Sequence, residues 1–166
     1  MLKPKNNFKV VTDKKTARVI LPNMLTLIGV CIGLTSIRFA LDGRFEFAIV
    51  AIILAAVIDG LDGRIARLIK GTSKVGKELD SLTDMISFGV APAFIMYFWK
   101  LNTLGRFGWL VCLIYVICVA LRLARFNVNT GQDPSWRDNF FEGVPSPAGG
   151  ILVLTPLIFS LTNYEF

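Results

Sequence analysis

Four aspartates near the middle of the chain have the residue type and spacing that a metal site requires. They are Asp59, Asp62, Asp80 and Asp84. At about 100° per residue, the first two share one face of a helix and the last two share one face of the next helix. Two antiparallel helices joined by a short connection would turn those faces toward each other. We therefore expect the four carboxylates to converge.

The cost of placing these carboxylates in a membrane indicates what they bind. An aspartate at the centre of a membrane helix costs about 2.5–3.5 kcal/mol, so four without partners would cost on the order of 10 kcal/mol. Carboxylate oxygens suit Mg²⁺ or Mn²⁺, and two such ions would balance the four aspartates charge for charge. A pair of ions that clamps phosphate oxygens favours displacement at phosphorus. The alternative is an acidic helix face that is open to water.

Small residues accompany the aspartates on the same two faces. Gly63 and Ala66 follow the first aspartate pair, and Gly76 precedes the second. Such residues by themselves are well explained by close packing of membrane helices. Their alternation with carboxylates and with Arg67, whose guanidinium suits a pyrophosphate, favours a bound ligand instead.

The elements that hold these residues are expected to be membrane helices. Hydrophobic residues make up 54% of the 166 residues and charged residues only 18%, with a mean hydropathy of +0.59. This composition is more apolar than that of a soluble domain. A membrane-spanning helix needs about 20 apolar residues. Five stretches approach or exceed that length: 19–41, 45–69, 82–99, 109–123 and 147–161.

The sequence thus predicts an all-α, polytopic helical bundle integral to a membrane, with a tight turn at Asp42-Gly43 between the first two spans. Basic residues precede the first stretch and follow the second and the fourth, which places these three segments and the aspartates in the cytoplasm. Residues 1–18 are expected to form a basic cytoplasmic juxtamembrane segment, either a surface helix or a disordered arm. The net charge of +6 is explained by anionic lipid, so no nucleic acid is expected as a partner.

The absence of histidine excludes several kinds of catalysis, and the cysteines indicate no metal site. The chain has no histidine, which excludes a histidine general base, a phosphohistidine intermediate and a His-ligated zinc site. The three cysteines, Cys31, Cys112 and Cys118, lie in apolar stretches without metal-ligand spacing and are interpreted as packing residues.

The complete pattern is Asp59-x2-Asp62-Gly63-x2-Ala66-Arg67-x8-Gly76-x3-Asp80-x3-Asp84. It resembles the signature of the CDP-alcohol phosphotransferases at every defined position. Segments 18–26, 121–127 and 141–147 are similar to those of the bacterial membrane-bound phosphatidylserine synthases within this family. The resemblance implies transfer of the phosphatidyl group from CDP-diacylglycerol to L-serine with release of CMP. It also implies six core helices, a homodimer, and a place in the bacterial cytoplasmic membrane.

The resemblance further implies roles for individual residues. Asp59, Asp62 and Asp80 would hold two Mg²⁺ or Mn²⁺ ions, while Asp84 would complete the second site and act as general base. The residues implied to line the CDP-lipid site are Asn23, Thr26, Gly63, Ala66, Arg67, Ser73 and Gly76. The serine carboxylate needs a cation, for which Arg122 and Arg125 are the candidates; both are equally well explained as cytoplasmic membrane anchors.

Alternatives remain at three points. The acceptor could be glycerol 3-phosphate or inositol, with the same chemistry. A divalent-cation transporter would also place aspartates in a membrane, although clustering at one membrane edge disfavours an ion path. A transmembrane domain over 19–166 with five spans either ends after the fifth helix or lacks further helices.

Overall fold

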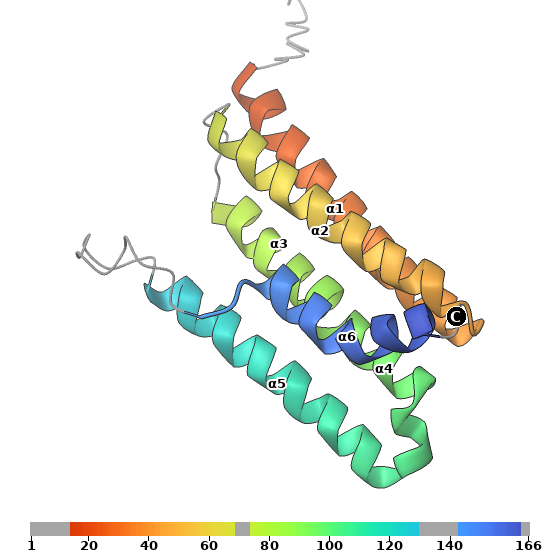
Figure 1. Cartoon of the computed structure of the whole chain (residues 1–166). Helices are drawn as coiled ribbons and strands as arrows, with labels where there is room; N and C mark the ends of the chain where they lie inside the picture. The colour runs from red at the N-terminus through yellow and green to blue at the C-terminus, as the bar shows by residue number, and fades with distance from the viewer. Residues whose placement is uncertain (1–13, 69–73, 130–142, 164–166) are drawn as a thin grey trace, which may run out of the picture.

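The computed structural model describes residues 14–68, 74–129 and 143–163, and these ranges consist of helices joined by short turns, with no strand. The all-α prediction is therefore confirmed (Figure 1). In chain order the elements are α1 (Lys14–Leu41), α2 (Phe45–Leu68), α3 (Lys74–Asp84), the π-helical turn η1 (Met85–Val90), α4 (Ala91–Trp99), the short 3-10 turn η2 (Leu101–Leu104), α5 (Arg106–Asn129) and α6 (Ser146–Asn163).

Helices α1 and α2 form an antiparallel hairpin along their whole length (Figure 1). The predicted turn is confirmed, because Gly43 adopts a φ of 74° that a residue with a side chain rarely adopts. The Gly43 N–H donates to the Ala40 carbonyl at 3.1 Å and the Arg44 N–H to the Phe39 carbonyl at 2.9 Å. The hairpin fixes the direction in which α2 delivers its aspartates.

The third long helix consists of α3, η1 and α4 in succession. The apolar stretch predicted a span starting at residue 82, but the helix begins at Lys74. Charged residues in α3 keep its hydropathy low, although a helical conformation and packing against α1 do not require an apolar sequence. The extension carries Gly76 and Asp80 on the same helix as Asp84, as the predicted common face requires.

Small residues allow close packing at the centre of the bundle. Ala48 and Ala55 of α2 and Ala91 of α4 are at most 1% exposed, and the larger Leu157 of α6 is fully buried beside this core. On α1, a Cβ at Gly33 would lie 3.0 Å from the Cα of Ser87. Small residues at such positions are typical of membrane helix interfaces, where van der Waals contact replaces the hydrophobic effect.

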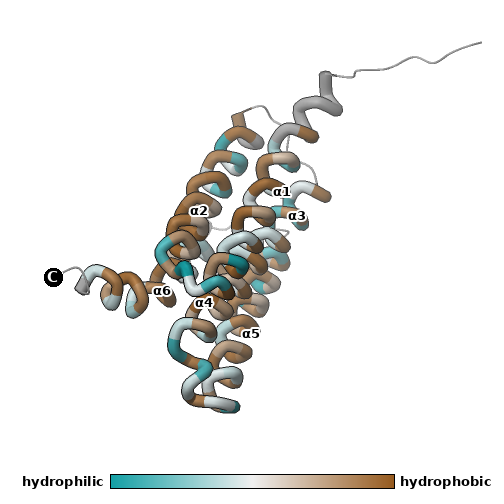
Figure 2. Tube along the Cα trace, turned by 90° about the vertical axis from the view of Figure 1, so that its right-hand side faces the viewer, coloured by the Kyte–Doolittle hydropathy of each residue, from teal (hydrophilic) through white to brown (hydrophobic). Residues whose placement is uncertain are grey.

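Three described segments are long and apolar enough to cross a membrane: Pro22–Leu41, Val75–Trp99 and Arg106–Val128. Hydrophobic residues predominate along the long helices (Figure 2), and Val57 and Ile117 are more than half exposed, as lipid-facing residues are. The chain is therefore an integral membrane protein. Helix α2 is long enough but carries several charges, and the apolar helix Ser146–Thr162 is shorter. Of the predicted juxtamembrane segment, residues 1–13 lie outside the described part, and Lys14 already belongs to α1.

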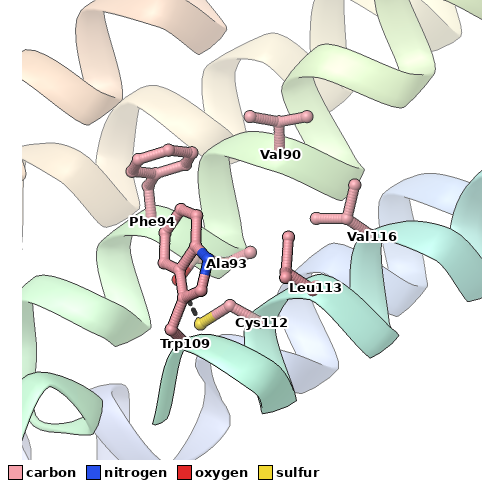
Figure 3. A pocket seen from close by; sticks show the side chains of 7 residues that line it. All are labelled: Val90, Ala93, Phe94, Trp109, Cys112, Leu113 and Val116. Atoms are coloured by element: carbon pink, nitrogen blue, oxygen red, sulfur yellow. Dashed lines mark hydrogen bonds between the residues drawn. The ribbon is translucent and has the colours of Figure 1, made fainter. Parts of the chain in front are cut away.

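Helices α4 and α5 enclose an open apolar cavity of about 240 Å³ (Figure 3). Its lining residues are Val90, Ala93, Phe94, Trp109, Cys112, Leu113 and Val116. The Phe94 and Trp109 rings meet edge to face at 5.9 Å, and the Cys112 thiol donates to the Ala93 carbonyl at 3.4 Å. Cys112 is buried here, in keeping with its interpretation as a packing residue, whereas Cys31 and Cys118 are exposed and do not fit that interpretation.

Candidate metal centre

Helices α2 and α3 bring three of the four aspartates together. One carboxylate oxygen from each of Asp59, Asp62 and Asp80 lies within 4.8 Å of the other two. Asp62 is only 3% exposed, while the other two are half-buried. The convergence predicted from helical spacing is thus confirmed for these residues. Three carboxylates at this separation repel one another unless a cation lies between them.

Asp84 extends this cluster toward α6. Its carboxyl contacts the side chain of Asp59 and the hydroxyl of Ser146. Asp84 Oδ1 and Asp62 Oδ1 are both buried and have no hydrogen-bond donor among the described residues. Buried oxygens without a donor are costly, and a hard divalent cation is the partner that carboxylates of this kind accept. The donor set therefore fits the predicted metal.

Thr26 of α1 supports the cluster from a third helix. Its hydroxyl lies 2.7 Å from Asp62 Oδ2 and 2.9 Å from the carbonyl of Pro22, one turn earlier. Thr26 is 5% exposed, so no bulk water competes for this hydroxyl. The contact orients Asp62 and leaves its other oxygen for a ligand. Asn23, predicted to line the same site, is half-buried on α1, three residues before Thr26.

The two candidate acceptor-binding arginines differ in position. Arg122 of α5 donates from Nη1 to Ser146 Oγ at 2.8 Å, and its charge acts on Asp84. Its Nε is buried and has no partner among the described residues. Arg125, by contrast, is exposed. Ser146, which links Arg122 to Asp84, was not among the predicted site residues; its only signal was membership of segment 141–147.

The predicted ligand-facing small residues are described in part. Gly63 and Gly76 are half-buried, and a Cβ at Gly63 would meet no described atom within 4 Å. Among the described residues, therefore, no side chain fills the position beside Gly63. Ala66 and Arg67 belong to α2, but their side chains lie outside the described part, as does the whole of Ser73. Their predicted roles stay predictions.

A polar contact joins α3 to α5 beside the aspartates. The Asn127 side-chain amide donates to the Ser81 hydroxyl at 3.0 Å. Ser81 directly follows Asp80, so this contact restrains the end of α5 against the metal-facing part of α3. Segment 121–127 thus supplies both Arg122 and Asn127 to the same region.

Comparison with known families agrees with this geometry. The family model of the CDP-alcohol phosphatidyltransferases matches residues 19–164, which include every described residue of the aspartate cluster. The chain belongs to this family of phosphatidyl-transferring enzymes.

The chain is also similar to individual enzymes of this family. The chain is 47% identical to a CDP-diacylglycerol–serine O-phosphatidyltransferase of Mycobacterium leprae over 144 residues, which are 86% of this chain and 48% of the relative. It is 42% identical to the enzyme of the same name from Helicobacter pylori over 147 residues, 89% of this chain and 60% of the relative. An archaetidylserine synthase of Methanothermobacter thermautotrophicus is 35% identical over 161 residues, which are 93% of this chain and 64% of the relative. The chain therefore spans between about half and two thirds of the length of these relatives.

Proposed function

We propose that the chain transfers the phosphatidyl group of CDP-diacylglycerol to the hydroxyl of L-serine and releases CMP. The observation that carries this proposal is the convergence of Asp59, Asp62 and Asp80 from two helices, with Asp84 in contact with Asp59. Family membership supports the phosphatidyl transfer, and the names of the relatives from M. leprae and H. pylori support serine as the acceptor.

In this mechanism the aspartates hold the metal. Asp59, Asp62 and Asp80 would hold Mg²⁺ or Mn²⁺, and Asp84 would complete a second site. Bound cations of this kind neutralise the charge of a pyrophosphate and of the departing phosphate oxygen. Gly63 and Gly76 leave room for the nucleotide, and Arg67 supplies a cation to the pyrophosphate, as the family signature implies.

Asp84 and Arg122 prepare the acceptor. Asp84 takes the proton of the serine hydroxyl while that oxygen forms a bond to the lipid-side phosphorus, and the bond from this phosphorus to the CMP oxygen breaks. The serine carboxylate binds the buried Nε of Arg122, which has no partner among the described side chains. The Ser146 hydroxyl lies between Arg122 and Asp84 and so aligns the two ends of the same small substrate.

The proposal includes an orientation and an assembly. The aspartates belong to the second half of α2 and to α3. The end of α2 and the start of α3 lie at the same end of the bundle as the start of α1 (Figure 1). This end carries Arg64, Lys77 and Arg125, so we place it in the cytoplasm of a bacterial cell. Residues 19–166 form the transmembrane domain, with the shorter α6 and the charged α2 as additional spans in a bundle of five to six helices. The homodimer implied by the family resemblance belongs to the same proposal.

The direct test is release of CMP from CDP-diacylglycerol by the purified chain in detergent with Mn²⁺ or Mg²⁺. Serine, glycerol 3-phosphate and inositol are compared as acceptors, and Asp84→Asn is the matched variant. We expect serine-dependent CMP release that the variant loses. Release with another acceptor would keep the phosphatidyl transfer and overturn the serine assignment. Metal flux into vesicles without CMP release would overturn the enzyme in favour of a cation transporter.

A further inference from the structure

A proline in α4 deprives one backbone carbonyl of its helical partner, directly after the metal-binding part of the third helix. In an α-helix the Phe88 carbonyl would accept from the N–H of residue 92. Residue 92 is Pro92, which has no N–H and whose ring crowds the carbonyl four residues earlier. Phe88 is only 1% exposed, so water does not satisfy this carbonyl.

The helix responds by widening. Residues Met85–Val90 are π-helical, and the Ala91 N–H donates to the Ile86 carbonyl, five residues back. Asp84 is the residue immediately before this turn. Since one residue corresponds to about 100° of rotation, a widened turn changes the angle between side chains before and after it. The turn thus sets the direction of Asp84 relative to the buried face of α4.

Tyr115 of α5 places a donor on the same carbonyl, in the place that the Pro92 N–H cannot fill. Its hydroxyl donates to the Phe88 carbonyl at 2.7 Å, across 27 residues of sequence. Its side chain is half-buried, and the neighbouring Cys112 reaches Ala93 in the same way. Figure 3 shows this α4–α5 seam with Cys112 directed at α4. Helix α5 therefore holds the carbonyls on both sides of Pro92.

Two other helices fix the same turn. On α6, a Cβ at Gly150 would lie 3.2 Å from the Phe88 carbonyl oxygen, so any larger residue would press on this turn. On α1, Gly33 packs directly against Ser87. The turn is thus held by α1, α5 and α6. Among the described side chains, Tyr115 alone donates a hydrogen bond to the Phe88 carbonyl.

We infer that Tyr115 is a positioning residue for Asp84. By holding the Phe88 carbonyl, it keeps the π-helical turn in the one arrangement that points Asp84 at the metal and the acceptor hydroxyl. The inference rests on the proposed function, because Asp84 is the proton acceptor there. Tyr115 itself touches no substrate in this scheme.

The test compares Tyr115→Phe with Tyr97→Phe, which removes the same hydroxyl from a half-buried tyrosine on α4. For Tyr115→Phe we expect kcat for CMP release to fall about tenfold while the KM values for serine and CDP-diacylglycerol stay unchanged. We also expect a several-fold weaker affinity for Mn²⁺, measured without substrate as the thermal stabilisation that Mn²⁺ gives the protein in detergent. Tyr97→Phe should match the wild-type chain in both.

The outcomes separate the inference from the proposed function. A wild-type chain that releases no CMP contradicts the function, whereas equal kcat and Mn²⁺ affinity in the two tyrosine variants contradict only the role of Tyr115. The double variant Pro92→Ala/Tyr115→Phe separates positioning from folding, because residue 92 then offers an N–H to the Phe88 carbonyl but no longer forces the wide turn. We expect the double variant to be more thermally stable than Tyr115→Phe while its kcat stays low. Full recovery of kcat would mean that Tyr115 serves folding alone and would overturn the inference.

Discussion

The hydroxyl of Thr26 lies 2.7 Å from a carboxylate oxygen of Asp62, across the interface between α1 and α2. Both residues are almost fully buried, so the hydrogen bond persists without competition from water. Mutation of a residue that orients a metal ligand in this way typically lowers metal affinity or activity by roughly 10–100-fold. The pair connects the first helix of the bundle to the candidate metal centre.

Thr26→Val should weaken Mn²⁺ binding and CMP release by about tenfold, because Asp62 loses the donor that orients it. Thr26→Ser keeps the hydroxyl and should restore most of the affinity. Thr35→Val is the control, since Thr35 is an exposed residue of the same helix whose hydroxyl donates to the Cys31 carbonyl at 2.6 Å. Mn²⁺ titration followed by thermal unfolding in detergent measures all three. Equal affinities for Thr26→Val and Thr35→Val would contradict an orienting role.

Removal of divalent metal should lower the thermal stability of the wild-type chain. A cation present at 100 times its dissociation constant stabilises a folded protein by about 2.7 kcal/mol, and a chelator removes that contribution. In Asp59→Asn the chelator should have a much smaller effect, because the cluster has lost a ligand and part of its charge repulsion. Asp42→Asn, at an exposed pair with Arg38 on the α1–α2 turn, should respond to chelator as the wild type does. A chelator effect that is the same in all three proteins would argue against a metal at the aspartates.

Gly63→Leu should raise the KM for CDP-diacylglycerol by about tenfold while leaving thermal stability nearly unchanged. No described atom lies within 4 Å of a Cβ at Gly63, and under the proposed function the new side chain enters the space of the nucleotide. Gly149→Leu is the control, since a Cβ at this α6 position also meets no described atom within 4 Å. A factor of ten in KM corresponds to about 1.4 kcal/mol of binding. A loss of stability without a change in KM would mean that Gly63 serves helix packing instead.

Gly33→Ala should destabilise the fold by about 1–3 kcal/mol, because the added methyl meets the backbone of Ser87 and the core cannot give way without moving α1. Gly149→Ala, in an open position of α6, should be neutral or stabilising by up to about 1 kcal/mol. The comparison is made by thermal unfolding of the two variants in the same detergent. Similar melting temperatures would show that the α1–η1 contact is looser than described.

Arg122→Ala should raise the KM for serine at least about tenfold, since its Nε is buried and its charge acts on Asp84. Arg125→Ala should have a smaller effect, because that side chain is exposed. Arg106→Ala, at the opposite end of α5, controls for loss of a membrane-edge charge. Steady-state CMP release at varied serine concentration gives the three values. A larger effect for Arg125 than for Arg122 would reverse the assignment.

Local sequence patterns predicted the helices of this protein and the aspartates that meet. The apolar stretches predicted the five long helical segments of the described residues. Hydropathy alone placed the start of the third segment too late, whereas the four-residue spacing of Gly76, Asp80 and Asp84 predicted that the helix includes them. The convergence of Asp59, Asp62 and Asp80 followed from helical periodicity and a short connection. These features depend on residues within one or two helices, where backbone geometry relates position in sequence directly to direction in space.

Contacts between distant helices were decided only by the tertiary structure. The choice between Arg122 and Arg125, the link through Ser146 and the support of Phe88 by Tyr115 depend on how α5 and α6 rotate and slide against the third helix. Hydropathy does not encode that rotation, because lipid and protein interiors are equally apolar and both faces of such a helix accept the same residues. The sequence by itself determined which carboxylates meet, whereas packing of small residues determined which side chains orient them.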